Sequence, residues 1–237
     1  MNTENKNIMK ISNLEIKTLK KDIKNIHLGV YPPEGRIRIA APSHVDDEAL
    51  RLLAISKLSW IKKQQKKFEN QERQTKREYI NGESHYFLGR RYLLEIIQDN
   101  KNHLMMNRNK IFLHIKNNSL ENKKNIFQKH YRTNLKNILK EIIPKWEERL
   151  NVKINKLVIR KMKTKWGSCN SEKSNILLNL ELAKKPLDLI EYVLVHEMTH
   201  LIERNHTKNF EQYLDYYLPN WKSQKEALNK SILSSYH

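Results

Sequence analysis

The run His196-Glu197-Met198-Thr199-His200 decides how this chain is interpreted, because it places two imidazoles and a carboxylate at helical spacing. Side chains four residues apart lie on the same face of an α-helix, so His196 and His200 can reach one metal ion. Glu197 is turned by about 100° around the helix axis from His196. From there its carboxylate can accept a proton from a water on the metal without binding the ion itself. The same five residues also occur by chance on surface helices, so the flanking sequence has to decide.

The flanking sequence predicts a helix that is buried along one side. Apolar residues recur at steps of three and four, and the two histidines lie outside this stripe, whose members are Leu187, Ile190, Leu194, Met198 and Leu201. A helix of this kind can be anchored in a core on one side while it presents metal ligands on the other. The pattern therefore favours a zinc site over a chance match.

A third ligand is expected, because catalytic zinc usually takes three protein ligands and keeps one position for water. His206 is the best candidate, but on an unbroken helix it would point away from His196 and His200. We therefore expect the helix to end between Glu203 and Asn205, where asparagine tolerates the left-handed conformation. Two alternatives stay open: Glu211 is the ligand instead, or His206 is a loop histidine that binds nothing.

Several further motifs occur in a fixed order: Trp166-Gly167-Ser168-Cys169, Leu178-Asn179, the run from Glu191 to Glu197, and Asn205-His206 followed by Phe210. In this order and spacing, the segment from Arg160 to Trp221 resembles the YgjP-like metallopeptidases, relatives of the SprT-like zinc proteases. A weaker resemblance at Arg36–Pro42 and Leu88–Tyr92 extends it over about residues 11–235 as one unit. The resemblance implies a zincin-like fold, one zinc ion per chain with His196, His200 and His206 as ligands, and Glu197 as the catalytic base. The family usually has a tryptophan after the phenylalanine, whereas Glu211 stands here, which keeps the Glu211 alternative open.

The candidate substrate cleft consists of Trp166, Gly167, Ser168 and Asn179. The first three are expected in a loop at the rim of the site, with packing as the main role of Trp166 and Cys169. The strand 176–182 is expected to lie beside the cleft and to pair with an extended substrate. Asn179 interrupts this apolar strand, so it orients a ligand or the loop, or it satisfies an internal hydrogen bond. Candidate oxyanion donors are Tyr213, Tyr216 and Tyr217.

Composition narrows the class of protein. The 237 residues include one cysteine, which argues against an internal disulfide framework, and 45 Lys and Arg against 26 Asp and Glu, a formal charge of +19. The basic residues are spread along the chain, so a compositional bias explains the charge better than a dedicated anionic ligand such as a nucleotide or nucleic acid. The polar first residues and the lack of a long apolar run predict a cytoplasmic protein with no membrane span. Oligomeric state is not specified by the sequence.

The expected architecture is α+β with a mixed sheet, an active-site helix and a β-rich N-terminal part. We expect a disordered tail at 1–10, a β-rich subdomain with a long helix at 11–118, and a zincin-like catalytic subdomain at 119–237. Strands are expected at 13–20, 26–31, 36–40, 92–98, 111–115, 157–162 and 176–182. Besides the active-site helix, helices are expected from Ser43 or Asp46 to about Gln74, from Ser119 to about Pro144 or on to Leu150, at 207–217 and at 221–233.

The favoured function is a zinc metallopeptidase that cleaves a polypeptide by Glu197-assisted attack of zinc-bound water. One alternative is a zinc-dependent hydrolase of nucleotides or other phosphoanhydrides, which the excess of lysine and arginine would suit. The second is a nucleic-acid-associated adaptor or protease. Intact Glu197 argues against a pure adaptor, since a protein that only binds has no need of a base at that position.

Overall fold

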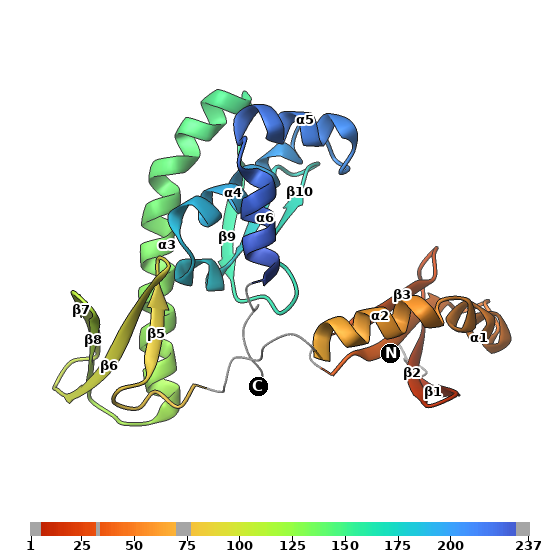
Figure 1. Cartoon of the computed structure of the whole chain (residues 1–237), viewed down its shortest axis with the longest axis horizontal. Coiled ribbons are helices and arrows are strands. Elements are labelled where there is room, and N and C mark those ends of the chain that lie inside the picture. The colour runs from red at the N-terminus through yellow and green to blue at the C-terminus, as the bar shows by residue number, and fades with distance from the viewer. Residues whose placement is uncertain (1–5, 32–33, 70–76, 231–237) are drawn as a thin grey trace. The chain divides into compact units, whose positions relative to one another are not determined.

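The computed structural model describes residues 6–31, 34–69 and 77–230, and for residues 6 and 67–69 it describes the backbone alone. Within these residues the strands form three mixed sheets. The described residues divide into two compact units, one within 6–69 and one within 77–230. The α+β class expected from the sequence is confirmed, and each unit is described by itself (Figure 1).

The first unit is a four-stranded sheet with two helices. Its strands are β1 (Lys6–Ile11), β2 (Leu14–Lys21), β3 (His27–Tyr31) and β4 (Arg36–Pro42), in the order β1-β2-β4-β3 with β2 and β4 parallel. Alternation along β4 buries Ile37, Ile39 and Ala41, as a half-buried strand requires. The disordered tail expected at 1–10 is wrong from residue 6 onward, because β1 pairs with β2 over its whole length. Residues 1–5, 32 and 33 lie outside the described part.

Two helices stand where one long helix is expected. Helix α1 (Asp47–Ser56) begins after Asp46, whose carboxylate accepts a hydrogen bond from the backbone N–H of Ala49. Helix α2 (Leu58–Glu69) follows at once, separated by Lys57 with φ −105° and ψ 7°. The expected end at about Gln74 lies outside the described residues. The apolar period continues across Lys57, so the break is invisible in the hydrophobic pattern.

The second unit begins with another four-stranded sheet of the same topology. Its strands are β5 (Ser84–Phe87), β6 (Arg90–Gln98), β7 (His103–Asn107) and β8 (Lys110–Ile115), in the order β5-β6-β8-β7 with β6 and β8 parallel. Leu88 and Gly89, with φ 46° and 80°, turn β5 into β6. Their backbone N–H groups donate to the carbonyls of Ala183 and Lys184. The hairpin tip is thereby fixed to the segment that precedes the active-site helix. Residues 77–115, expected in the N-terminal subdomain 11–118, therefore pack in the same compact unit as that helix.

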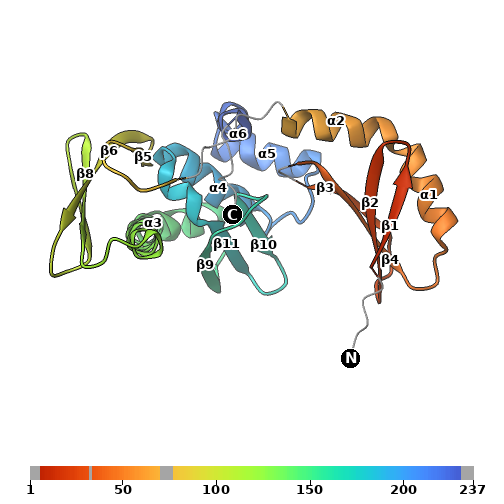
Figure 2. The same ribbon diagram turned by 90° about the horizontal axis from the view of Figure 1, so that it is seen from below.

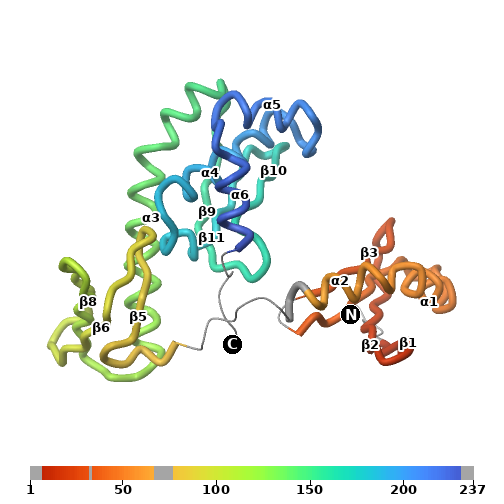
Figure 3. The backbone as a smooth tube through the Cα atoms, viewed as in Figure 1, coloured from red at the N-terminus to blue at the C-terminus, as the bar shows by residue number. Residues whose placement is uncertain are grey.

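Helix α3 (Leu120–Leu150) extends through the second unit and begins at the predicted cap, Ser119. Figure 1 shows β5–β8 beside the first part of α3 and the rest of the unit beside its end. The remaining elements are β9 (Lys156–Arg160), β10 (Gly167–Asn170), β11 (Asn175–Asn179), the 3₁₀ helix η1 (Leu180–Lys184), α4 (Leu187–Thr199), α5 (Lys208–Tyr217) and α6 (Trp221–Lys230). Figure 3 follows this backbone from β9 to α6.

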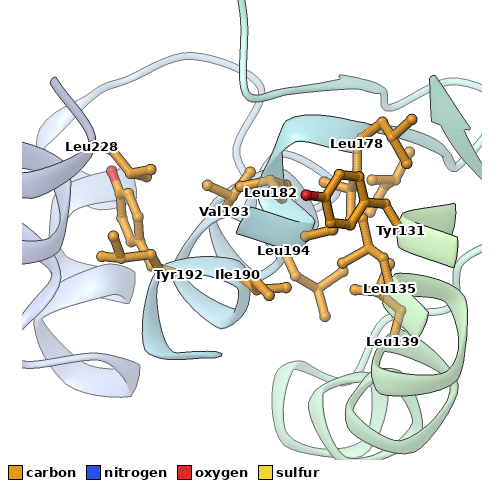
Figure 4. Close-up of a cluster of buried hydrophobic side chains, with 14 of the residues drawn as sticks. Tyr131, Leu135, Leu139, Leu178, Leu182, Ile190, Tyr192, Val193, Leu194 and Leu228 are labelled. Carbon is orange, nitrogen blue, oxygen red and sulfur yellow. The ribbon is translucent and has the colours of Figure 1, made fainter. Parts of the chain in front are cut away.

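The core of the second unit joins α3 to α4. Figure 4 shows Leu135 and Leu139 of α3 in one cluster with Ile190 and Leu194 of α4, and all four side chains are fully buried. Full burial of each large aliphatic side chain contributes roughly 1.5–3 kcal/mol. Within the described residues, no helix has both the length and the apolar character to cross a membrane.

Candidate active site

Helix α4 carries His196, Glu197 and, at its C-cap, His200, and its opposite side is fixed in the core. Ile190, Leu194 and Met198 of the apolar stripe are buried, whereas Leu187 at the helix start is 53 % exposed and Leu201, beyond the helix end, is half-buried. Trp146 of α3 adds a polar anchor, since its Nε1 donates to the Glu191 carboxylate at 2.7 Å. Packing and this hydrogen bond therefore set the rotation of α4 about its axis, which determines where the two histidines point.

The chain reverses directly after α4. The helix ends at Thr199, whose carbonyl accepts from the N–H groups of both Ile202 and Glu203 in a tightened last turn. Helix α5 starts after Thr207, whose hydroxyl accepts from the backbone N–H of Phe210. The expectation that α4 would end between Glu203 and Asn205 is wrong, and Asn205 is not among the residues with positive φ. The early end leaves enough chain for His206 to return to the helix.

His196, His200 and His206 come together at this reversal. The Nε2 atoms of His196 and His206 are 3.1 Å apart, and one ligand nitrogen from each histidine lies within 4.8 Å of the others. The ring of Phe210 packs against all three imidazoles, with centroid separations of 5.0, 4.7 and 4.7 Å. Phe210 therefore forms an apolar wall behind the cluster.

The protonation of the cluster suits metal binding. The backbone carbonyl of Glu203 lies 3.2 Å from His200 Nδ1 and can only accept, so Nδ1 donates and Nε2 keeps a free lone pair. Burial, helped by the neighbouring His200 and His206, lowers the pKa of His196 to about 3, so its imidazole is neutral at neutral pH. Two nitrogens on one tetrahedral zinc ion, each at 2.0–2.1 Å, are roughly 3.3 Å apart, close to the separation of His196 and His206. The three imidazoles thus fit a zinc ion that keeps one open position.

Glu197 is buried at the floor of the site and is 6 % exposed. Strand β10 approaches it so closely that a Cβ on Gly167 would lie 2.6 Å from Glu197 Oε1. Burial raises the pKa of Glu197 to about 7, and the positive charge of Lys165 acts in the opposite direction. A carboxyl group whose pKa lies near neutrality can both accept and return a proton, which is the requirement for general acid–base work.

Asn179 holds the loop that leads into β10. The side chain is fully buried, and its amide nitrogen donates to the carbonyls of Met162 and Lys165 at 2.9 and 2.8 Å. Its amide oxygen accepts from the N–H groups of Met162 and Glu181, both at 3.2 Å. Of the roles considered for Asn179, these bonds show that it orients the loop through satisfied internal hydrogen bonds. The bond from its own N–H to the Trp166 carbonyl extends this support to the residue before Gly167.

Strand β10 is the edge of the three-stranded sheet β10-β11-β9, as Figure 2 shows. The segment Trp166–Cys169, expected as a loop, supplies most of this strand, whereas β11 is paired on both sides. The expectation that 176–182 would be the free edge is therefore wrong. That segment also stops being a strand at Asn179, because the Asn179 side chain caps the 3₁₀ helix η1.

The cleft has two lobes that share Lys165, Gly167, His196, Glu197 and His206. The larger lobe, of about 560 Å³, is polar and is lined further by His200, Cys169 and the residues Ser168, Asn170, Ser171, Glu172, Arg204 and Asn205. The smaller, of about 380 Å³, is mainly apolar and is lined further by Trp166, Tyr192, Val193, Phe210, Trp221 and Leu228 among others. A substrate that crosses the histidine cluster therefore meets a polar surface on one side and an apolar hollow on the other.

A comparison with protein families agrees with this geometry. The family described as "YgjP-like, metallopeptidase domain" matches residues 24–231. The chain belongs to the YgjP-like metallopeptidase family. Membership makes it a metal-dependent peptidase by class, with a polypeptide as the class of substrate.

Among solved structures, the chain is similar to the metallopeptidase zymogen of Methanocaldococcus jannaschii jannalysin. The two are 25 % identical over 40 % of this chain and 86 % of the other, with a TM-score of 0.33. A comparison with curated proteins gave no match.

This YgjP-like site gathers most of the residues singled out in the sequence and separates others from it. Trp166, Gly167 and Ser168 line the cleft, while Asn179 supports it from behind. Glu211 lines the apolar lobe but is not part of the three-histidine group. Among the tyrosines considered as oxyanion donors, Tyr216 is 78 % exposed and Tyr217 packs against Trp146. None of Tyr213, Tyr216 and Tyr217 is among the residues that line the two lobes.

Tyr192 was missed in the sequence, although its spacing could have revealed it. It lies four residues before His196, hence on the same helix face, and its ring contacts the His196 ring at a centroid separation of 5.8 Å. Burial, followed by the charge of Glu197, raises the pKa of Tyr192 to about 12, so the phenol stays protonated. It is the tyrosine among the residues that line the apolar lobe.

Proposed function

We propose that the chain is a zinc-dependent peptidase of the zincin type, in which His196, His200 and His206 bind one zinc ion and Glu197 is the catalytic base. The observation that carries the proposal is the convergence of three imidazoles beside a buried carboxylate whose pKa is near 7. A zinc ion held by this triad would polarise the scissile carbonyl as a Lewis acid and lower the pKa of a water molecule toward neutrality. Cys169 is free, which suits a reducing compartment such as the cytoplasm.

Glu197 moves the proton in this reaction. It accepts a proton from the attacking water as the new C–O bond forms, and the burial of its carboxyl keeps that proton from exchanging freely with solvent. When the C–N bond breaks, the same carboxyl gives the proton to the departing amine nitrogen. The positive charge of Lys165 opposes the rise of the Glu197 pKa and so favours the ionised carboxylate that starts the cycle.

Substrate placement is proposed along β10. The free edge of this strand offers unpaired backbone groups, so an extended polypeptide can add to the sheet beside Glu197. Gly167 lets the strand approach the carboxylate, and the two lobes then receive the side chains on either side of the scissile bond. We propose that the apolar lobe selects an apolar side chain of the substrate.

His206→Ala should sharply lower the zinc content of purified protein, because two imidazoles from one helix leave the ion poorly held. Glu211→Ala removes the rival carboxylate and should leave one zinc per chain. The measurement is metal content by atomic emission after dialysis against a weak chelator. Full metal in His206→Ala combined with loss in Glu211→Ala would reassign the third ligand.

Gly167→Ala should lower kcat by about a hundredfold while zinc remains bound, because the new methyl group displaces the Glu197 carboxylate. Gly82→Ala is the control: Gly82 has φ 80° but nothing within 4 Å of an added Cβ, so this change strains the backbone away from the cleft. Steady-state kinetics should show normal kcat for Gly82→Ala. Normal kcat for Gly167→Ala as well would mean that the close approach to Glu197 has no catalytic role.

Hydrolysis of a phosphoanhydride is the second candidate function, because Lys165 and Arg204 line the polar lobe. Of the lysines near Trp166, however, Lys161, Lys163 and Lys173 are not among the residues that line the two lobes. The position of these three lysines outside the lobes favours a polypeptide over a phosphoanhydride as the substrate.

A paired screen decides between the substrates. An unfolded, neutral peptide should be cleaved at a rate that changes little with salt, because contacts between exposed charges are the ones that ionic screening weakens. With a nucleoside triphosphate as the true substrate, Lys165→Gln should raise KM strongly, while the matched Lys163→Gln should not. Triphosphate hydrolysis that depends on Glu197, without cleavage of any unfolded protein, would replace the peptidase proposal.

A further inference from the structure

Two histidines and an aspartate meet on the β5–β8 sheet, apart from the cleft. His103 opens β7, His114 lies near the end of β8, and Asp99 directly follows β6. Because β8 lies between β6 and β7, Asp99 and His103 reach His114 from opposite sides. His103 and His114 are also direct cross-strand partners, and the N–H of Asp99 is fixed to the Ile115 carbonyl. Three sequence segments therefore converge on one point through regular backbone pairing.

The side chains of these residues are close enough together to bind one metal ion. The rings of His103 and His114 stack with centroids 4.0 Å apart and planes at 14°. One ligand atom from each of Asp99, His103 and His114 lies within 4.8 Å of the others, and all three residues are partly buried. Within the described residues, this is the group besides the histidine cluster of the cleft in which three such atoms meet.

The hydrogen bonds of the pair fix which nitrogens are free. His114 Nδ1 is 2.7 Å from Asp99 Oδ2, and His103 Nδ1 is 3.3 Å from the Lys101 carbonyl. A carboxylate and a carbonyl only accept, so both Nδ1 atoms donate, which leaves Nε2 of each ring as the nitrogen that can bind a metal ion. A histidine whose second nitrogen donates to a carboxylate or a backbone carbonyl has the arrangement of a metal ligand.

We propose that Asp99, His103 and His114 form a second metal site, which binds a divalent transition-metal ion through the two imidazoles, with the Asp99 carboxylate orienting the His114 ring. Imidazole is a donor that suits zinc, nickel and copper better than magnesium or calcium. An ion held by the two imidazoles would cross-link β7 and β8 and stabilise the sheet in proportion to its binding. The site is independent of the peptidase proposal, since it shares no residue with the cleft.

Isothermal titration calorimetry of the metal-free full chain with zinc chloride tests this site. Wild type should bind two equivalents, and His114→Ala and His103→Ala should each bind one. His206→Ala should keep the equivalent that His114→Ala loses, and Asp99→Asn should weaken that equivalent at least tenfold. His44→Ala, which removes an exposed histidine of the first unit, is the control and should keep two.

Each alternative outcome has a definite reading. A single equivalent in wild type that is lost in His206→Ala and kept in His114→Ala, or a second equivalent that survives in both His114→Ala and His103→Ala, would overturn the site. Equal weakening of the second equivalent by His44→Ala would make it nonspecific surface binding, which also overturns the proposal. Far-ultraviolet circular dichroism of each variant shows whether a lost equivalent reflects a loss of folding. His103→Gln provides a milder substitution for the same comparison.

Discussion

Glu197→Gln should retain one zinc ion in the cleft and lose peptide hydrolysis by a factor of about 10²–10⁴, the range expected when a general base is removed. Glutamine keeps the size and polarity of glutamate, and the three histidines that form the ligand cluster are untouched. What disappears is the group that takes the proton from water and returns it to the leaving amine. Single-turnover cleavage of a fluorogenic peptide, measured together with the metal content, separates this chemical effect from a loss of metal.

The matched control for this experiment is Glu141→Gln, the same change at an exposed position on α3. It should have the kcat of wild type. Unchanged turnover in a Glu197→Gln protein that holds its full zinc content would point to another base or to a contaminating activity. A parallel loss of zinc would instead show that Glu197 contributes to metal binding, contrary to its position beside the ligand cluster.

The site was predictable from the sequence where its determinants are local. Helical spacing places His196 and His200 on one face, and the period of Ile190, Leu194 and Met198 marks the buried side of the same helix. The start of α3 at Ser119 follows from a capping residue before an apolar pattern, and the structure confirms it. These features depend on residues within one or two turns of each other.

What escaped prediction depends on pairing between distant segments. Strand β10 consists of glycine, serine, cysteine and asparagine, a composition without strand propensity, and it forms because β11 offers it a partner. β5 and β7 were missed for a similar reason: each is short, and each exists as the antiparallel neighbour of a better strand. The sequence shows no repeat, yet both four-stranded sheets have the same order and the same pair of parallel central strands. The two four-stranded sheets therefore share one topology although their sequences are not repeats of each other.

Asn179→Leu should produce the largest loss of stability among the substitutions considered. The side chain is completely buried and makes hydrogen bonds with Met162, Lys165 and Glu181. Leucine is similar in size but leaves those backbone groups without their partner, at a cost of roughly 1–3 kcal/mol for each buried group. The sum of several such costs approaches the 5–15 kcal/mol that stabilises a typical domain. Unfolding of the second unit in urea, monitored by tryptophan fluorescence, should have its midpoint at a markedly lower urea concentration than in wild type.

Asn155→Leu is the matched control, because Asn155 is an exposed asparagine that bonds to Lys173 and Asn175 at the end of the same sheet. Its change should cost far less, since water can replace the lost partners. Equal midpoints for the two variants would mean that the loop 162–166 does not depend on Asn179.

If the loop does depend on Asn179, the Asn179→Leu protein that remains folded at low temperature should still bind zinc through the histidines of α4 and the following turn. It should nevertheless cleave peptide poorly, because the Trp166 backbone that leads Gly167 to Glu197 has lost its support. That separation of metal binding from turnover would place the positioning of β10, and not only the ligand set, among the requirements of the reaction.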